Sequence, residues 1–459
     1  MVDQPLKPDS QRIRDEIDAG FHEAVGHLEN LVRLPSLSKP GAPEGPIQQS
    51  AEYVRNMFRD LVAWDSCEIV TVGQGRPAVI ARKSSEPGKP TVLLYAHHDV
   101  QPPGDPSSWT TPAFEPSVRD GRLYGRGSAD DGAGIITHWL ALRAGAALDR
   151  GLGGLGVALF IEGEEESGSP TFDQLLETYS EHLRADVIIV ADSDNPSTTT
   201  PALTTSLRGV VGLTVTVKTA DFPVHSGMFG GVVPDALTVL VRLLATLHDD
   251  DHRVAVAGIG GNRPPVVGGD GDRLRRDAGV LEGVDLWGAE AIHQRLWWEP
   301  SLTITGIDAT PVRDASNTLW PTAAARVSVR IPPDSSPQKA LTALKAHLAE
   351  SVGRDALLEF SDEEVGPGFI TRTDHRLLPV AHAALEEAFG QPVVHQGVGG
   401  TIPFVSAFEA ANPGALILIT GVEDPESRAH SSNESVDLEM VRRCGLAEAL
   451  FVNRVSSAG

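Results

Sequence analysis

The chain has 459 residues, 41% of them hydrophobic and 22% charged, so it is long enough for two or three domains. Its 62 acidic residues outnumber its 38 lysines and arginines. The resulting formal charge of −24 argues against nucleic acid or an anionic membrane as a partner. The first residues carry no apolar signal segment, and only two cysteines occur, Cys67 and Cys444. We therefore expect a cytoplasmic protein in which any metal is held by His, Asp and Glu.

The N-terminal part of the chain alternates short apolar runs with segments of helical periodicity. From Ile13 to Leu31, apolar residues recur at helical spacing after the possible caps Asp9 and Ser10. Further on, we expect strands at 67–72, 78–82, 91–95, 156–161 and 186–191, and helices around 135–142 and 171–183. Strands that alternate with helices indicate an α/β domain, with a mainly parallel sheet and helices on both faces.

The pattern changes between residues 209 and 362. Apolar and polar residues alternate at 211–217 and at 325–331, which is typical of strands with one exposed face. Helices are predicted there at 235–247 and 336–351, and a strand at 356–360. The helix–strand alternation then resumes, with helices at 375–389, 402–411 and 436–455 and a strand at 415–420. We predict a discontinuous α/β domain of residues 1–208 and 363–459, interrupted by a smaller α+β domain of residues 209–362.

Acidic residues and histidines follow the ends of several predicted strands. In an α/β sheet this is the edge at which ligands bind. His97 and Asp99 are two residues apart, so on extended chain the carboxylate can hold the ring nitrogen that faces away from a metal. Asp194 competes with Asp192, which we prefer because it directly ends its strand. The candidate metal ligands are His97, Asp130, Glu166, Asp192 and His430.

This oxygen-rich set with two imidazoles suits Zn²⁺, Mn²⁺ or Co²⁺. Five protein ligands are too many for one open catalytic zinc ion. They fit two metals that share a carboxylate and leave room for a bridging water. Glu165, next to a candidate ligand, could take a proton from that water as general base.

Several of these segments resemble those of the co-catalytic metallopeptidases that include aminoacylases, acetylornithine deacetylases, glutamate carboxypeptidases and carnosinases. They occur in the family's order at His97–Pro102, Gly125–Asp131, Glu162–Ser169 and Ala429–Ser431. Within the family, the chain most resembles the branch of cytosolic non-specific dipeptidases and carnosinases, because of Glu165–Ser169 and Leu203–Gly209. Further matches to that branch are His225–Gly231 and Gly399–Pro403.

The resemblance implies two divalent metals per chain, with zinc favoured and Mn or Co as alternatives. His97, Asp130 and Asp192 would hold one metal, and Asp130, Glu166 and His430 the other. Asp99 would orient His97, Glu165 would be the base, and the Asp130–Asp131 peptide bond would be cis.

The resemblance also implies that the inserted domain is a lid that forms a homodimer. His225 would polarise the scissile carbonyl, in its own subunit's site or in the partner's, and Arg330 would pair with the substrate carboxylate. Further substrate-binding positions would be Asn317, Thr318, Gly399, Gly400 and Thr401.

The expected activity is hydrolysis of an amide bond next to a free carboxylate, and a dipeptidase is the first hypothesis. An N-acyl-amino-acid deacylase or a related amidohydrolase is the alternative within the same chemistry. A non-catalytic, metal-stabilised scaffold protein is the alternative of another class. Because Glu165 and all five candidate ligands are present, the sequence favours the enzyme.

Overall fold

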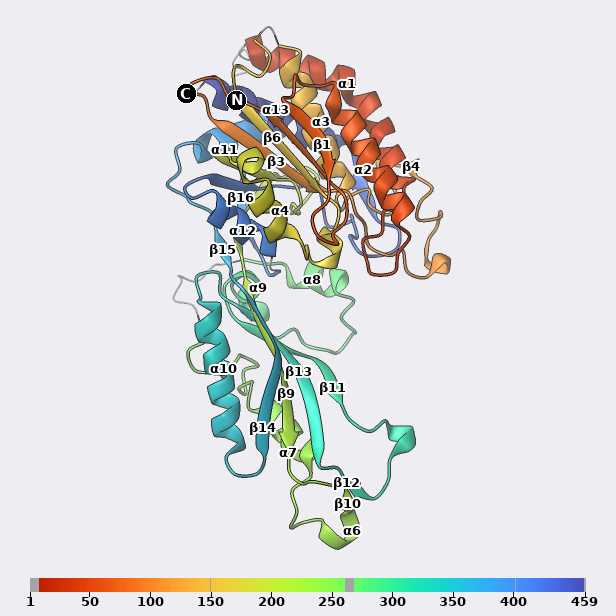
Figure 1. Cartoon of the computed structure of the whole chain (residues 1–459), viewed down its shortest axis with the longest axis vertical. Coiled ribbons are helices and arrows are strands. Elements are labelled where there is room, and N and C mark those ends of the chain that lie inside the picture. Colours follow the sequence, from red (N-terminus) through yellow and green to blue (C-terminus); the bar gives the residue numbers. More distant parts are fainter. Residues whose placement is uncertain (1–7, 149, 261–267, 401, 458–459) are drawn as a thin grey trace. The chain divides into compact units, whose positions relative to one another are not determined.

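The computed structural model describes residues 8–148, 150–260, 268–400 and 402–457 (Figure 1). The chain divides into two compact units. Unit 1 comprises Met1–Thr205, Thr371–His395 and Ala407–Gly459, and unit 2 comprises Ser206–Ile370 and Gln396–Ser406. The domain boundaries that we placed after residues 208 and 362 stay a prediction.

The main sheet of unit 1 is built around four parallel strands. Its order is β1-β2-β6-β3-β7-β17-β8, in which β6, β3, β7 and β17 are parallel neighbours. β1, β2 and β8 pair antiparallel at the sides. The bounds are β1 Ser66–Val70, β2 Ala78–Lys83, β3 Thr91–His97, β6 Gly156–Glu162, β7 Val187–Val190, β8 Ala202–Leu207, β16 Val394–Val398 and β17 Leu416–Ile419. The predicted α/β class with a mainly parallel sheet is confirmed.

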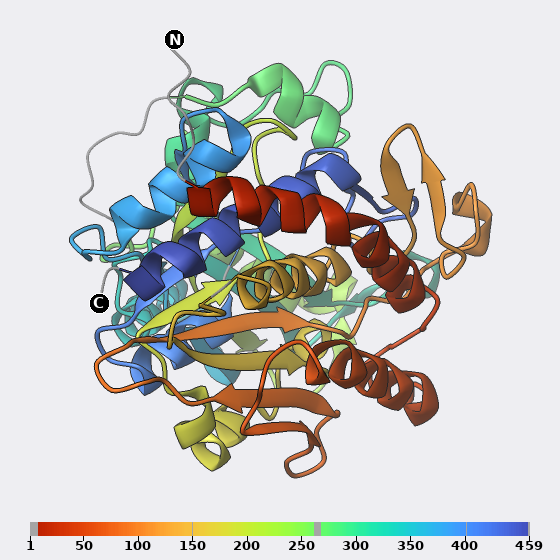
Figure 2. The same ribbon diagram turned by 90° about the horizontal axis from the view of Figure 1, so that it is seen from above.

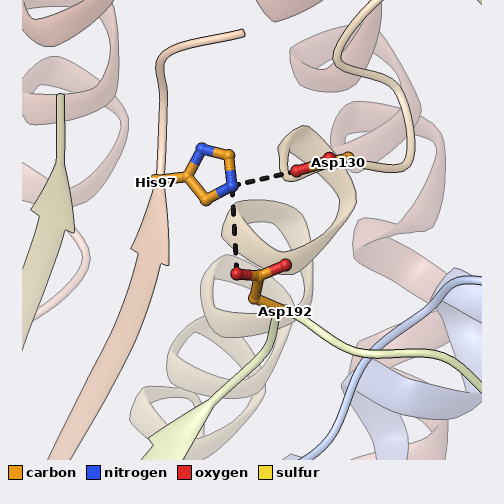
Figure 3. A group of neighbouring side chains, drawn as sticks. All are labelled: His97, Asp130 and Asp192. Carbon is orange, nitrogen blue, oxygen red and sulfur yellow. Dashed lines mark ion pairs between the residues drawn. The ribbon is translucent and has the colours of Figure 1, made fainter. Parts of the chain in front are cut away.

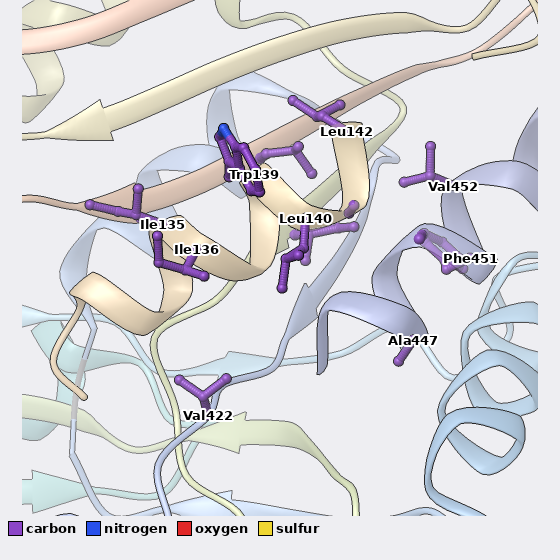
Figure 4. Close-up of a cluster of buried hydrophobic side chains, with 14 of the residues drawn as sticks. Ile135, Ile136, Trp139, Leu140, Leu142, Val422, Ala447, Phe451 and Val452 are labelled. Atoms are coloured by element: carbon purple, nitrogen blue, oxygen red, sulfur yellow. The ribbon is translucent and has the colours of Figure 1, made fainter. Parts of the chain in front are cut away.

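Helices cover both faces of this sheet. On one face Leu94 and Leu159 join a core that includes residues of α1, α2, α3, α11 and α13. Figure 2 shows α1 (red) and α13 (dark blue) beside α3, and Figure 4 shows side chains of α3 and α13 within this core. On the other face, Tyr95 and Phe160 pack against Phe172 of α4 and Phe408 of α12. The helices are α1 Pro8–Val32, α2 Glu44–Arg59, α3 Gly132–Ala146, α4 Phe172–Thr178, α11 Leu378–Phe389, α12 Pro403–Ala411 and α13 Leu438–Ser457.

A second, small sheet of unit 1 has the order β18-β5-β4 and is antiparallel. Its strands are β4 Ser117–Arg119, β5 Arg122–Tyr124 and β18 Ser435–Asp437. It brings the segment before Asp130 beside the segment that follows His430. Two regions that are more than 300 residues apart in sequence are thereby joined near the predicted ligands.

Unit 2 contains an antiparallel sheet of order β11-β13-β9-β14. The predicted alternation is confirmed, because Val211, Leu213, Val215 and Val217 all point into a core beneath two helices. The strands are β9 Gly209–Lys218, β11 Ser301–Asp308, β13 Thr322–Ile331 and β14 Leu357–Gly366, and the helices are α7 Ala236–Ala245 and α10 Pro337–Val352. Shorter elements are β10 Val224–His225, α6 Ser226–Phe229, α8 Gly271–Asp277, α9 Ile292–Trp297, β12 Thr318–Leu319 and β15 Phe369–Ile370.

Three local expectations differ from the structure. The helix predicted at 171–183 is two short helices, α4 and α5 (Ser180–Leu183), because the backbone of Tyr179 leaves the helical region between them. β3 runs two residues beyond the predicted end, so His97 is its last residue. α2 was missed, although its buried residues recur at helical spacing. None of the described helices is long and apolar enough to cross a membrane.

Candidate metal centre

The five candidate ligands come from segments at one edge of the parallel sheet. His97 ends β3 and Asp192 follows β7, while Glu166 lies in a 3₁₀ turn, Glu165–Ser167, after β6. Asp130 precedes α3, and His430 lies in the segment between β17 and β18. Since β6, β3 and β7 are parallel neighbours, the segments that leave their carboxyl ends meet at that edge.

His97, Asp130 and Asp192 form the first group (Figure 3). The Nε2 atom of His97 lies 2.9 Å from Asp130 Oδ1 and 4.0 Å from Asp192 Oδ2. One potential ligand atom from each residue lies within 4.8 Å of the others. Asp194 is exposed and is absent from both groups that the described residues form, so the geometry favours Asp192.

Asp130, Glu166 and His430 form the second group. His430 Nε2 lies 2.9 Å from Asp130 Oδ2 and 3.2 Å from Glu166 Oε2. Asp130 therefore turns one carboxylate oxygen towards each histidine. This is the arrangement that a carboxylate shared by two metal ions requires.

The residues present fit a pair of divalent cations. His97 is fully buried, and its Nε2 atom is among the described buried polar atoms that make no hydrogen bond, despite the nearby carboxylate. A buried nitrogen without a hydrogen bond is costly, and a metal would satisfy it. Imidazole nitrogen together with carboxylate oxygen is a donor set that suits Zn²⁺, Mn²⁺ or Co²⁺.

Asp99 and Asp131 fix the position of His97 through contacts with its ring and with its backbone. His97 Nδ1 lies 3.0 Å from the main-chain oxygen of Asp99 and 3.5 Å from its carboxylate Oδ1. The nearer contact is thus the carbonyl, whereas the sequence had suggested the carboxylate. That carboxylate accepts hydrogen bonds from the backbone N–H groups of Glu165 and Glu166. Asp131 caps α3 and accepts a hydrogen bond from the backbone N–H of His97.

The electrostatics of the site reflect its crowded carboxylates. Burial, together with the charges of Asp192 and Asp130, raises the pKa of Glu165 to about 9. Hydrogen bonds to Asp130 and Glu166 raise the pKa of His430 to about 11. His430 must therefore release a proton before its nitrogen can bind a metal, and cations nearby would lower the pKa of Glu165. The Asp130–Asp131 peptide bond is cis, as the resemblance implied.

Sequence reasoning missed two groups that hold the ligands. Glu434 is fully buried and accepts hydrogen bonds from Arg126 Nη1 at 2.6 Å and from the backbone N–H groups of Gly127, Ala129 and Asp130. Gln101 donates to both oxygens of Glu166, from its backbone and from its side chain. Gln101 belongs to the segment His97–Pro102, which carries part of the family resemblance. Glu434 follows His430 by only four residues, but nothing in the sequence distinguished it from a surface glutamate.

The other predicted site residues belong to unit 2. His225 is exposed and pairs with Thr318 between β10 and β12, and the Asn317 carbonyl accepts a hydrogen bond from the backbone N–H of Ser226. Arg330 is half-buried on β13, on the side away from the unit 2 core. Gly399 and Gly400 follow β16, and the Gly399 carbonyl accepts a hydrogen bond from Arg208 at 3.0 Å. Thr401 lies outside the described residues.

Residues 93–453 match the sequence pattern described as Peptidase family M20/M25/M40. The chain belongs to this family. Among its relatives, the cysteinylglycine-S-conjugate dipeptidase of Corynebacterium striatum is 34% identical over 82% of this chain and 83% of its own length. The Cys-Gly metallodipeptidase dug1 of Schizosaccharomyces pombe is 28% identical over 95% of this chain and 96% of its own length.

Solved structures agree with this M20 fold. Human carnosine dipeptidase 1 superimposes with a TM-score of 0.76 at 25% identity, covering 98% of this chain and 100% of its own. The di-peptidase Dug1p from Saccharomyces cerevisiae gives a TM-score of 0.77 at 21% identity, covering 98% of each chain. The chain is therefore a metal-dependent peptidase of the M20 family with a candidate dinuclear site.

Proposed function

We propose that this M20 peptidase hydrolyses small dipeptides at a two-metal centre made by His97, Asp130, Glu166, Asp192 and His430. The observation that carries the proposal is Asp130, whose two oxygens each lie 2.9 Å from a different histidine. The relatives named for Cys-Gly substrates support a dipeptide with a small C-terminal residue.

In the proposed reaction, two bound divalent cations, with zinc favoured, supply Lewis acidity and a water of lowered pKa. Glu165 takes a proton from the attacking water and passes it to the leaving amine. Asp99 keeps Glu165 in place, because its carboxylate accepts a hydrogen bond from the backbone N–H of Glu165 at 3.1 Å. It also holds the His97 ring through its own carbonyl oxygen, at 3.0 Å.

We further propose that unit 2 supplies the substrate contacts. Arg330 would pair with the free carboxylate of the substrate, because a guanidinium binds carboxylates in a bidentate manner. His225 would polarise the scissile carbonyl. Asn317 and Thr318, at the start of β12, would contact the substrate, together with Gly399, Gly400 and Thr401, which come after β16 in the sequence.

Glu165→Gln tests the catalytic assignment. The substitution keeps the size of the side chain but removes the base, so kcat should fall by about 10²–10⁴-fold while both metals stay bound. Turnover and metal content are measured on the same preparation. Glu177→Gln, on an exposed residue of α4, is the matched control and should behave as the wild type. Near-normal turnover of Glu165→Gln would refute the assignment.

A substrate screen separates the dipeptidase from the deacylase. Cys-Gly and β-Ala-His are compared with N-acetyl amino acids at equal concentration, with Zn²⁺, Mn²⁺ or Co²⁺ added after chelation. We expect the highest kcat/KM for a dipeptide. Faster hydrolysis of the N-acyl amino acids would favour the deacylase, and a lack of turnover with every metal would favour the scaffold protein.

We also propose a homodimer formed through unit 2. Large apolar side chains are exposed near the β10–β12 ribbon, among them Met228, Phe229, Val232 and Trp320. Exposed apolar groups of this kind are typical of protein interfaces. Sedimentation should give twice the mass of one chain, and Val232→Glu should shift the equilibrium towards the monomer. A wild-type monomer at micromolar concentration would contradict the proposal.

A further inference from the structure

His430 differs from the other predicted ligands because it lies in a long irregular segment. Its side chain is 58% exposed, whereas that of His97 is fully buried. Arg428, His430 and Asn433 all have left-handed backbone conformations, with φ of 56°, 61° and 60°. Such conformations are unfavourable for residues with a Cβ atom. This segment therefore needs contacts elsewhere to keep His430 beside Asp130 and Glu166.

A buried arginine holds the base of that segment. Arg122 of β5 donates from Nη1 to Asp424 Oδ2 at 2.9 Å, from Nε to Ser435 Oγ at 2.9 Å and from Nη2 to the Ser435 carbonyl at 3.0 Å. The side chains of Arg122 and Asp424 are 9% and 1% exposed. The guanidinium thus joins the residues on either side of His430, six before it and five after it.

The residues on either side of His430 are also joined to each other. The backbone N–H of Asp424 donates to Ser427 Oγ, and the backbone N–H of Ser435 donates to the Ser427 carbonyl, both at 2.9 Å. The segment is therefore a closed loop whose two ends meet at Arg122. A loop that is closed at its base has far fewer conformations to lose when its histidine binds a ligand.

The group around His97 is held by other contacts. His97 is fixed by Asp99 and Asp131, and its strand is in the middle of the parallel sheet. Within the described part of the chain, neither Arg122 nor Asp424 forms a hydrogen bond or ion pair with His97, Asp99 or Asp131. Glu434, by contrast, bonds the backbone N–H of Asp130 and so acts on both groups.

We propose that Arg122 is a positioning residue that sets the affinity of the metal site containing His430, and that the His97 site is independent of it. The inference rests on the proposed metal ligands. Groups that hold a ligand in place commonly change metal affinity by about 10–100-fold. Lys in place of Arg122 keeps the charge but loses the fork that spans Asp424 and Ser435.

The test starts from the full-length chain after its metal has been removed with a chelator. This chain is titrated with Zn²⁺ and with Co²⁺, and binding is measured by calorimetry and, for Co²⁺, by the absorption spectrum. The wild type should bind two ions with two dissociation constants, and His430→Ala should identify the constant of its site. Arg122→Lys should raise that constant about tenfold and leave the other within about twofold. Arg143→Lys is the matched control, because Arg143 joins α3 to Glu16 of α1, away from the ligands.

A double-mutant cycle makes the inference specific. In the His430→Ala background, Arg122→Lys should have no further effect on the remaining constant. Asp424→Asn provides a second variant, which keeps the size of the side chain but removes the negative charge that pairs with Arg122. Far-UV circular dichroism verifies that each chain is folded. If Arg122→Lys binds two ions with both dissociation constants unchanged, or with both raised equally, the proposed role of Arg122 is refuted while the ligand set stands. Fewer than two ions bound by the wild type would instead refute the proposed ligand set.

Discussion

Glu434→Gln should destabilise the metal-free chain by several kcal/mol. Each carboxylate oxygen of Glu434 accepts two hydrogen bonds: Oε2 from Arg126 and Gly127, and Oε1 from Ala129 and Asp130. A glutamine amide keeps one acceptor oxygen, so two buried donors lose their partner at about 1–3 kcal/mol each. The sum, about 2–6 kcal/mol, agrees with the cost of about 3–5 kcal/mol for breaking a buried ion pair.

Urea unfolding of the chelated chain measures this loss. Burial raises the pKa of Glu434 to about 7, so the experiment is done at pH 8.5, where the carboxylate is ionised. Because burial raises the pKa of Glu434 in the folded chain above that of an unfolded glutamate, the wild type takes up a proton on folding and gains stability as the pH falls through about 7. Gln does not titrate, so the difference in stability between wild type and Gln should widen between about pH 8.5 and pH 5. Glu177→Gln is the control for a solvated glutamate. A loss of less than about 1 kcal/mol at pH 8.5 would refute the idea that Glu434 anchors the Asp130 segment.

Three further outcomes are expected. Asp192→Asn should lower the number of metal ions bound per chain, whereas Asp194→Asn, on an exposed residue, should not; metal analysis after gel filtration distinguishes them. Phe408→Ala removes a ring whose centroid lies 5.4 Å from that of Tyr95, and should cost about 3–5 kcal/mol in urea unfolding. Burial raises the pKa of the Cys444 thiol, so iodoacetamide at pH 8 should modify it only when the chain unfolds, as followed by mass spectrometry.

The sequence identified most of the candidate site because its signals are local. His97 ends a strand, and Asp192 and the Glu165–Glu166 pair follow strands; each of these strands has four to seven residues and a mostly apolar sequence that makes it recognisable. Parallel strands bring such segments to one edge without any further information. The alternation at 211–217 and 325–331 likewise predicted the half-exposed strands of unit 2, because a period of two depends only on neighbouring residues.

Other features depend on partners far away in the sequence. Glu434 is a buried anchor only because β18 pairs with β5, which brings it to a segment about 300 residues earlier. The break between α4 and α5 at Tyr179 could not be predicted, because no glycine or proline lies near it in the sequence. The nearer contact of His97 Nδ1 is the Asp99 carbonyl, and a spacing of two residues cannot distinguish a residue's backbone oxygen from its carboxylate.

The two halves of the candidate centre are therefore built differently. The His97 group uses side chains at the ends of sheet strands, whose positions the sheet itself fixes. The His430 group depends on a loop with three left-handed residues, held at its base by Arg122 and beside Asp130 by Glu434. Asp130 belongs to both groups, and Glu434 accepts a hydrogen bond from its backbone N–H, so these two residues connect the loop to the buried half. Metal binding at the exposed half should consequently be the step that is sensitive to the integrity of the loop.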